Sequence, residues 1–220
     1  CIDILMQQTP KPMVLAELFT SECEVLEKQK RYTDMERLTV RWRGFLDKYL
    51  EENHIGKTEP GMLPNWAYYY LGCGQAALGL GKVEQAEEML DECRKYIPDG
   101  ESAVYRSWLY YRIRYLTMLE FYPEAVLLSD QLIALHEGIG DWAELIRVKQ
   151  QRAELLTHLG RHAEAAELYN EMYQINDSIN ISDTKRQLAE MNTKYALDEE
   201  RMKHAEEQMS SIITIAVIIV

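Results

Sequence analysis

Gly81-Lys82-Val83-Glu84-Gln85-Ala86 decides the fold of this 220-residue chain, because related stretches begin 39 and then 40 residues further on. Gly160-Arg161-His162-Ala163-Glu164-Ala165 repeats it closely, and Glu120-Phe121-Tyr122-Pro123-Glu124-Ala125 is a degenerate copy between the two. In each copy a turn residue is followed by the start of a helix that carries an alanine. A recurring unit of this length that consists of helix, turn and helix is typical of a helical solenoid.

The rest of the chain fits such a repeat. Only six prolines interrupt it, and apolar residues make up 47% of it and recur at helical spacing. We therefore predict an all-α fold, a right-handed solenoid of helix pairs with a hydrophobic core. The paired helices are expected at residues 11–30 and 32–52, 65–80 and 83–97, 101–119 and 122–137, and 142–159 and 162–177.

The charge balance argues against nucleic acid as a partner of this region. Acidic side chains outnumber basic ones by 36 to 24, which gives a net charge of −12. A surface of this sign repels phosphate backbones. The basic residues are interleaved with acids, as on solvated helix faces, and form no stripe.

The sequence offers little support for catalysis, metal binding or a cofactor. It contains no nucleophile elbow, phosphate loop or H-E-x-x-H motif, and its four cysteines form no C-x-x-C pair. We therefore predict no enzyme activity, metal or cofactor for this region. Cys73 and Cys93 fall on the two helices of one predicted pair, where either a disulfide or two buried thiols would fit.

Residues 67–100 resemble a tetratricopeptide repeat. Gly74 lies where the two helices approach each other, Gly81 makes the turn, Ala86 lets the second helix nest, and Pro98 ends the unit. Such a resemblance implies a binding module that presents a surface and carries no chemistry of its own. The repeats are expected near residues 16–49, 67–100, 106–139 and 146–179, within a repeat domain at 11–179.

A charged helix with a heptad pattern is predicted to follow, at residues 180–211. Its apolar positions would form the seam of a homodimer through residues 181–210, or would dock back onto the last repeat. The residues assigned to the seam are Leu188, Met191, Tyr195, Met202, Ala205 and Met209.

The sequence ends on a nine-residue apolar run, 212–220, which is too short to cross a bilayer. We expect it to be the start of a transmembrane helix, with a buried C-terminal segment or a swapped strand as the alternatives. Repeats, heptad helix and apolar run in this order resemble the extracytoplasmic half of bacterial membrane-bound sensors. The stretches 176–180 and 187–195 are the parts of the sequence that most resemble those sensors.

The resemblance to sensors implies a ligand-binding module whose repeats lie in the periplasm or elsewhere outside the cytoplasm. It would be membrane-associated and would pass a signal to an output domain beyond residue 220, such as a histidine kinase or a helix-turn-helix transcriptional regulator. Two alternatives remain open. One is a membrane-anchored scaffold that assembles partner proteins, and the other is a soluble peptide-responsive regulator.

The concave side of the solenoid is the predicted binding groove, because the first helix of each pair lines it. Tyrosine and arginine supply much of the energy at binding surfaces, and Arg114 with Arg147 could clamp a peptide carboxylate. The alternative for any single tyrosine is a place in the core between repeats. The predicted groove residues for a peptide or protein ligand are Tyr68, Gln75, Tyr110, Tyr111, Arg114, Arg147, Gln150, Gln151 and Glu154.

Overall fold

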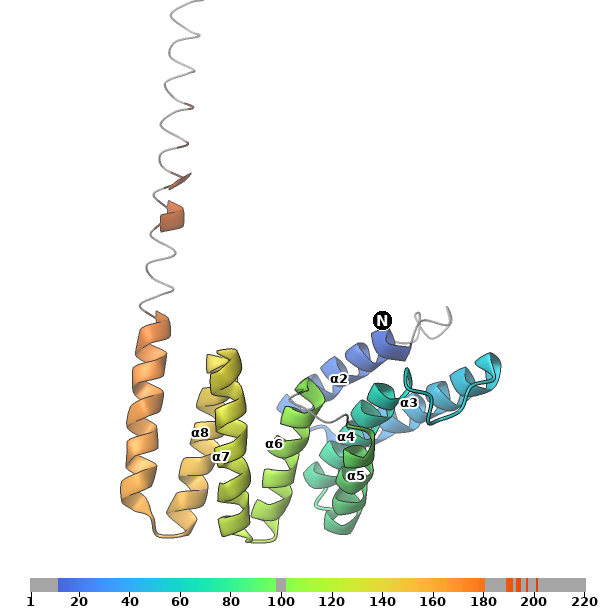
Figure 1. Cartoon of the computed structure of the whole chain (residues 1–220), viewed down its shortest axis with the longest axis horizontal. Coiled ribbons are helices and arrows are strands. Elements are labelled where there is room, and N and C mark those ends of the chain that lie inside the picture. The colour runs from blue at the N-terminus through green and yellow to red at the C-terminus, as the bar shows by residue number, and fades with distance from the viewer. Residues whose placement is uncertain are drawn as a thin grey trace, which may run out of the picture. The chain divides into compact units, whose positions relative to one another are not determined.

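A computed structural model describes residues 12–97 and 102–180, together with residues 189–191, 193, 194, 197 and 201 of the tail (Figure 1). Every regular element in this part of the chain is a helix, so the predicted all-α class is confirmed. The helices are α2 (Pro12–Lys28), α3 (Tyr32–Asn53), α4 (Leu63–Gly79), α5 (Val83–Tyr96), α6 (Ala103–Met118), α7 (Tyr122–Ile139) and α8 (Trp142–His158), followed by a helix at 162–180.

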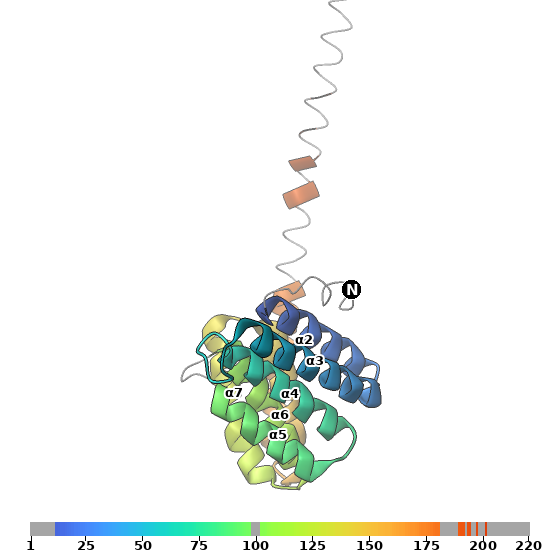
Figure 2. The same cartoon turned by 90° about the vertical axis from the view of Figure 1, so that its right-hand side faces the viewer.

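Consecutive helices pack side by side in pairs, which is the arrangement of a tetratricopeptide-type repeat (Figures 1 and 2). The pair α4 and α5 packs most extensively, and α4 also contacts α2 and α6, the first helices of the neighbouring pairs. Contacts divide the chain into two compact units after Tyr169. Helices α2 to α8 and the site described below belong to the first unit.

The turn inside each pair has the same backbone geometry four times. Lys30, Gly81, Glu120 and Gly160 all adopt the left-handed conformation, with φ between 57° and 72°. At each turn this residue donates its N–H to the carbonyl three residues back, and the next residue donates to the carbonyl five residues back. These two bonds define a Schellman motif, which ends a helix where glycine is favoured. The recurring stretch in the sequence is therefore the signature of one repeated turn.

Glu120 is the strained member of this set, because a side chain in the left-handed region costs roughly 1–2 kcal/mol. We expect Glu120→Gly to raise the free energy of unfolding by about 1 kcal/mol, measured by urea denaturation. Glu124→Gly, in the exposed first turn of α7, is the control and should lower it by about 0.5–1 kcal/mol. A loss of stability in both variants would contradict the role given to the turn.

Small residues allow α4 to lie close to its neighbours. The Cβ of any larger residue at Gly72 would lie 3.3 Å from the buried ring of Trp42 on α3. At Gly79 it would lie only 2.0 Å from Cδ1 of Tyr32, so glycine alone fits there. On α3, the apolar side chains Leu38, Trp42, Phe45 and Leu46 are buried.

Cys23, Cys73 and Cys93 are free, buried thiols. Of the two possibilities for Cys73 and Cys93, a disulfide or two buried thiols, the structure has the buried thiols. Burial raises the pKa of the Cys23 thiol to about 12, and the pKa values of the other two are also raised by burial. These cysteines therefore pack as small apolar side chains.

The predicted membrane-associated, extracytoplasmic location is wrong. Among the described residues, no helix combines the length and the apolar character that a membrane span requires. The apolar run 212–220, on which that prediction depended, lies outside the described residues.

The predicted dimer seam falls mostly outside the described residues. Met191 is helical and half exposed, whereas Leu188, Tyr195, Met202, Ala205 and Met209 are not described. The homodimer, the linker at 180–211 and the repeat boundaries stay predictions.

Candidate functional site: the groove between α6 and α8

The first helices of the pairs are not evenly spaced along the first unit. α2 contacts α4 and α4 contacts α6, but α6 and α8 approach each other less closely, and α7 packs against both. The side chains that fill the space between α6 and α8 are long and polar. They leave two adjoining pockets, which we call the α6/α8 groove.

The larger pocket has a volume of about 380 Å³ and lies toward the C-terminal ends of α6 and α8. The smaller, of about 270 Å³, lies toward their N-terminal ends and includes Glu24 of α2. Both volumes are in or near the range of small-ligand sites. The larger pocket is lined by Tyr110, Arg114, Thr117, Met118, Arg147, Gln150, Gln151, Glu154, Leu155 and His158. The smaller is lined by Glu24, Ala103, Arg106, Ser107, Tyr110, Leu132, His136, Asp141, Glu144 and Arg147.

The structure brings six of the nine predicted groove residues together around the larger pocket, three of them being Tyr110, Arg114 and Arg147. The other three lie elsewhere. Gln75 and Tyr111 are buried, and Tyr68 is half-buried against the core of the N-terminal pairs.

A stacked pair forms the boundary between the two pockets. The Arg147 guanidinium lies 3.8 Å from the centre of the Tyr110 ring, and both residues line both pockets. Nε of Arg147 also donates to Oε2 of Glu144 at 2.7 Å. Burial disfavours charge on Arg147, but Tyr110 and Glu144 outweigh it and raise the pKa of the guanidinium above its ordinary value. Arg147 is therefore a fixed cation whose charge is already balanced.

Arg114 is held in the same way by a carboxylate from α2. Its Nη1 donates to Oε1 of Glu27, while Oε2 of Glu27 accepts from Nε2 of Gln75 at 2.7 Å and from the hydroxyl of Tyr111 at 2.8 Å. Burial would lower the pKa of Arg114, but the Glu27 carboxylate raises it above its ordinary value. Glu27 thus joins α2, α4 and α6 behind the larger pocket.

The opposite wall of the larger pocket presents amide groups from α8. Nε2 of Gln150 donates to Oε1 of Glu154 at 3.2 Å. Oε1 of Gln151 is buried and has no hydrogen-bond partner among the described residues. A buried acceptor without a donor costs about 1–3 kcal/mol.

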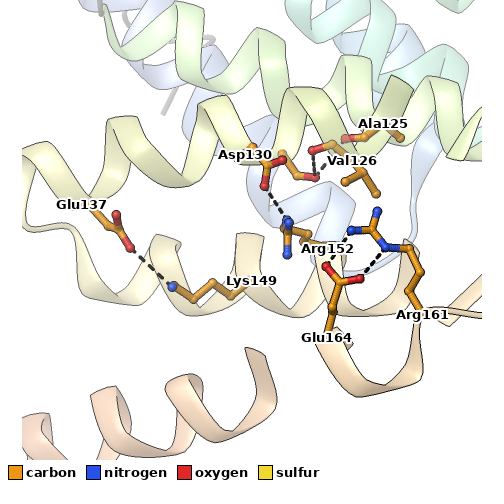
Figure 3. Close-up of polar contacts among 9 residues, drawn as sticks. Ala125, Val126, Asp130, Glu137, Lys149, Arg152, Arg161 and Glu164 are labelled. Atoms are coloured by element: carbon orange, nitrogen blue, oxygen red, sulfur yellow. Dashed lines mark hydrogen bonds and ion pairs between the residues drawn. The ribbon is translucent and has the colours of Figure 1, made fainter. Parts of the chain in front are cut away.

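Contacts between α7 and α8 fix the position of this wall (Figure 3). Arg152 donates to Oδ1 of Asp130 at 2.5 Å, and the buried Lys149 lies 3.4 Å from Oε1 of Glu137. At the start of the next helix, Arg161 forms a two-pronged pair with Glu164, with distances of 2.7 and 2.6 Å. Arg152 and Lys149 lie on the side of α8 that the groove residues do not use.

Sequence reasoning missed the two carboxylates that partner the groove arginines. Glu144 is three residues from Arg147 on α8, a spacing that signals an ion pair and could have been recognised. Glu27 is 87 residues from Arg114 and has no local signal. Within the described ranges, no group of His, Cys, Asp or Glu side chains is placed to hold a metal ion.

The chain is similar in fold to a solved structure. Over 79% of this chain and 73% of the other, the fold is similar to that of Bacillus thuringiensis PlcR, crystallised in complex with the peptide PapR7 and DNA, with a TM-score of 0.44 and 16% identity. No protein-family model matches the chain, and no curated protein matches it by sequence.

Proposed function

We propose that this chain is a non-catalytic binding module whose α6/α8 groove holds a segment of a peptide or protein. The observation that carries the proposal is the composition of the larger pocket, where an aromatic ring, two fixed guanidinium groups and two side-chain amides converge. Tyrosine and arginine dominate the energy of protein interfaces. Amide and guanidinium N–H groups suit the carbonyl groups of a polypeptide backbone.

The polar lining of the larger pocket supports a backbone ligand in particular. A peptide offers both N–H donors and C=O acceptors, so it can pair with the Glu154 carboxylate and with the free N–H groups of the arginines together. A purely apolar ligand would leave these groups without partners. Passage of a signal through the C-terminal helix stays a prediction. A scaffold that only assembles partner proteins is the second candidate for the function.

The test is a binding measurement with a synthetic pool of eight-residue peptides, capped at both ends and randomised in uncharged residues. We expect Tyr110→Ala to lower retention of the pool about tenfold, because it removes the aromatic platform shared by both pockets. Tyr68→Ala is the matched control, since Tyr68 is also half-buried on a first helix but lines neither pocket.

Thermal unfolding of both variants shows whether they remain folded at the binding temperature. Equal retention of the peptide pool by Tyr110→Ala and by the parent would show that the peptide does not bind in this groove. Failure of the parent to retain any peptide would overturn the proposed function.

A further inference from the structure

Both arginines that reach the larger pocket already bind a carboxylate of the chain itself. Arg147 pairs with Glu144 on its own helix, and Arg114 pairs with Glu27 from α2. The side chains of Arg114 and Glu27 are only 29% and 21% exposed, so this pair is screened less than a surface pair, whereas those of Arg147 and Glu144 are 47% and 39% exposed. The two guanidinium groups are therefore neutralised as binding charges, although they keep free N–H donors.

The surroundings of the groove are acidic beyond this pairing. Three guanidinium groups face it, from Arg106, Arg114 and Arg147. These three positive charges are outnumbered by five carboxylates, which belong to Glu24, Glu27, Asp141, Glu144 and Glu154. His136 adds no positive charge near neutral pH, because burial lowers its pKa below the ordinary value.

We infer that the ligand of the α6/α8 groove carries no net negative charge, and that Glu27 and Glu144 are the specificity residues that exclude anions. This inference rests on the proposed function and narrows its ligand to neutral or cationic peptide segments. It replaces the expectation that Arg114 and Arg147 clamp a peptide carboxylate. A ligand carboxylate that bound either arginine would lie next to the carboxylate that this arginine already binds. The two negative charges would repel each other.

Three peptide pools test the inference, each eight residues long and capped at both ends. The pools share their random uncharged positions and differ at two fixed positions, which hold aspartate, asparagine or lysine. At low ionic strength we expect the parent to retain the aspartate pool roughly fivefold less than the asparagine pool. The lysine pool should be retained at least as well as the asparagine pool.

Glu144→Gln is the decisive variant, because it frees the charge of Arg147 and keeps the size of the side chain. We expect it to raise retention of the aspartate pool to that of the asparagine pool or above. Glu164→Gln is the matched control, since it removes a carboxylate from a similar three-residue pair with Arg161 away from the groove. Glu27→Gln should shift the same ratio, and this provides a second variant.

The outcomes separate the inference from the function on which it depends. If the asparagine pool binds and Tyr110→Ala abolishes its binding, but the aspartate pool binds best, only the inference is wrong. An unchanged ratio in both Glu144→Gln and Glu27→Gln would also overturn it. If the parent retains none of the three pools, the proposed function and the inference fail together.

Discussion

Trp42→Ala should lower the free energy of unfolding by about 3–5 kcal/mol, which is the usual cost of removing a fully buried tryptophan. Trp42 on α3 is completely buried. Its ring stacks on Phe19 of α2 with 4.8 Å between centres and meets Tyr69 of α4 edge-on at 6.0 Å. One side chain therefore joins three helices. The backbone at Gly72 already packs directly against this ring, so little rearrangement is available to fill the cavity that the substitution would leave.

The measurement is urea or thermal unfolding followed by circular dichroism. Trp142→Ala is the control, because Trp142 is half exposed at the start of α8 and should cost less than about 1 kcal/mol. If the Trp42→Ala protein does not fold, Trp42→Phe keeps the test open with an expected loss of about 1–3 kcal/mol. Equal stabilities for the alanine variants at Trp42 and Trp142 would show that the packing of α2, α3 and α4 is not as described.

Glu27→Ala is expected to have the second largest effect, a loss of about 2–3 kcal/mol. The substitution leaves three donors without their acceptor, on Gln75, Tyr111 and Arg114. Removing one partner of a buried ion pair costs about 3–5 kcal/mol, and the partial exposure of this pair places the loss toward the low end. The measurement is again the free energy of unfolding.

Glu36→Ala is the control for Glu27→Ala. Glu36 pairs with Lys82 across two helix pairs, but both side chains are more than a third exposed, so the pair should contribute less than about 1 kcal/mol. Glu27→Gln keeps an acceptor and should lose less than Glu27→Ala. A loss at Glu27 no greater than that at Glu36 would mean that the network behind the groove adds little to stability.

The helix pairs could be predicted from sequence because their signals are local. The turn at Gly81 and the alanine at position 86 recur at a fixed interval, and each marks a helix end or a close helix contact. Even the degenerate turn at Glu120 keeps the geometry, since the bonds that define a Schellman motif join backbone atoms. The side chain at this position therefore changes the energy of the turn more than it changes the backbone conformation.

The site could be predicted only in part, because its geometry depends on spacing between helices. Periodicity placed Tyr110, Arg147 and Gln150 on one face, and the structure gathers them around one pocket. The same pattern placed Gln75 and Tyr111 on that face, but α2 covers them through Glu27. A helix distant in sequence decided which residues remain accessible, and no local pattern records such a contact.

Amide hydrogen exchange with a bound peptide tests the central claim most directly. A single peptide isolated from the uncharged pool would be added to the parent protein, and protection would be compared along the chain. We predict slower exchange in 107–118 and 147–158, the groove segments of α6 and α8. No change is expected in 36–40 and 85–89, which line a separate cavity of about 510 Å³. Protection confined to 36–40 and 85–89, with none in α6 and α8, would contradict the account.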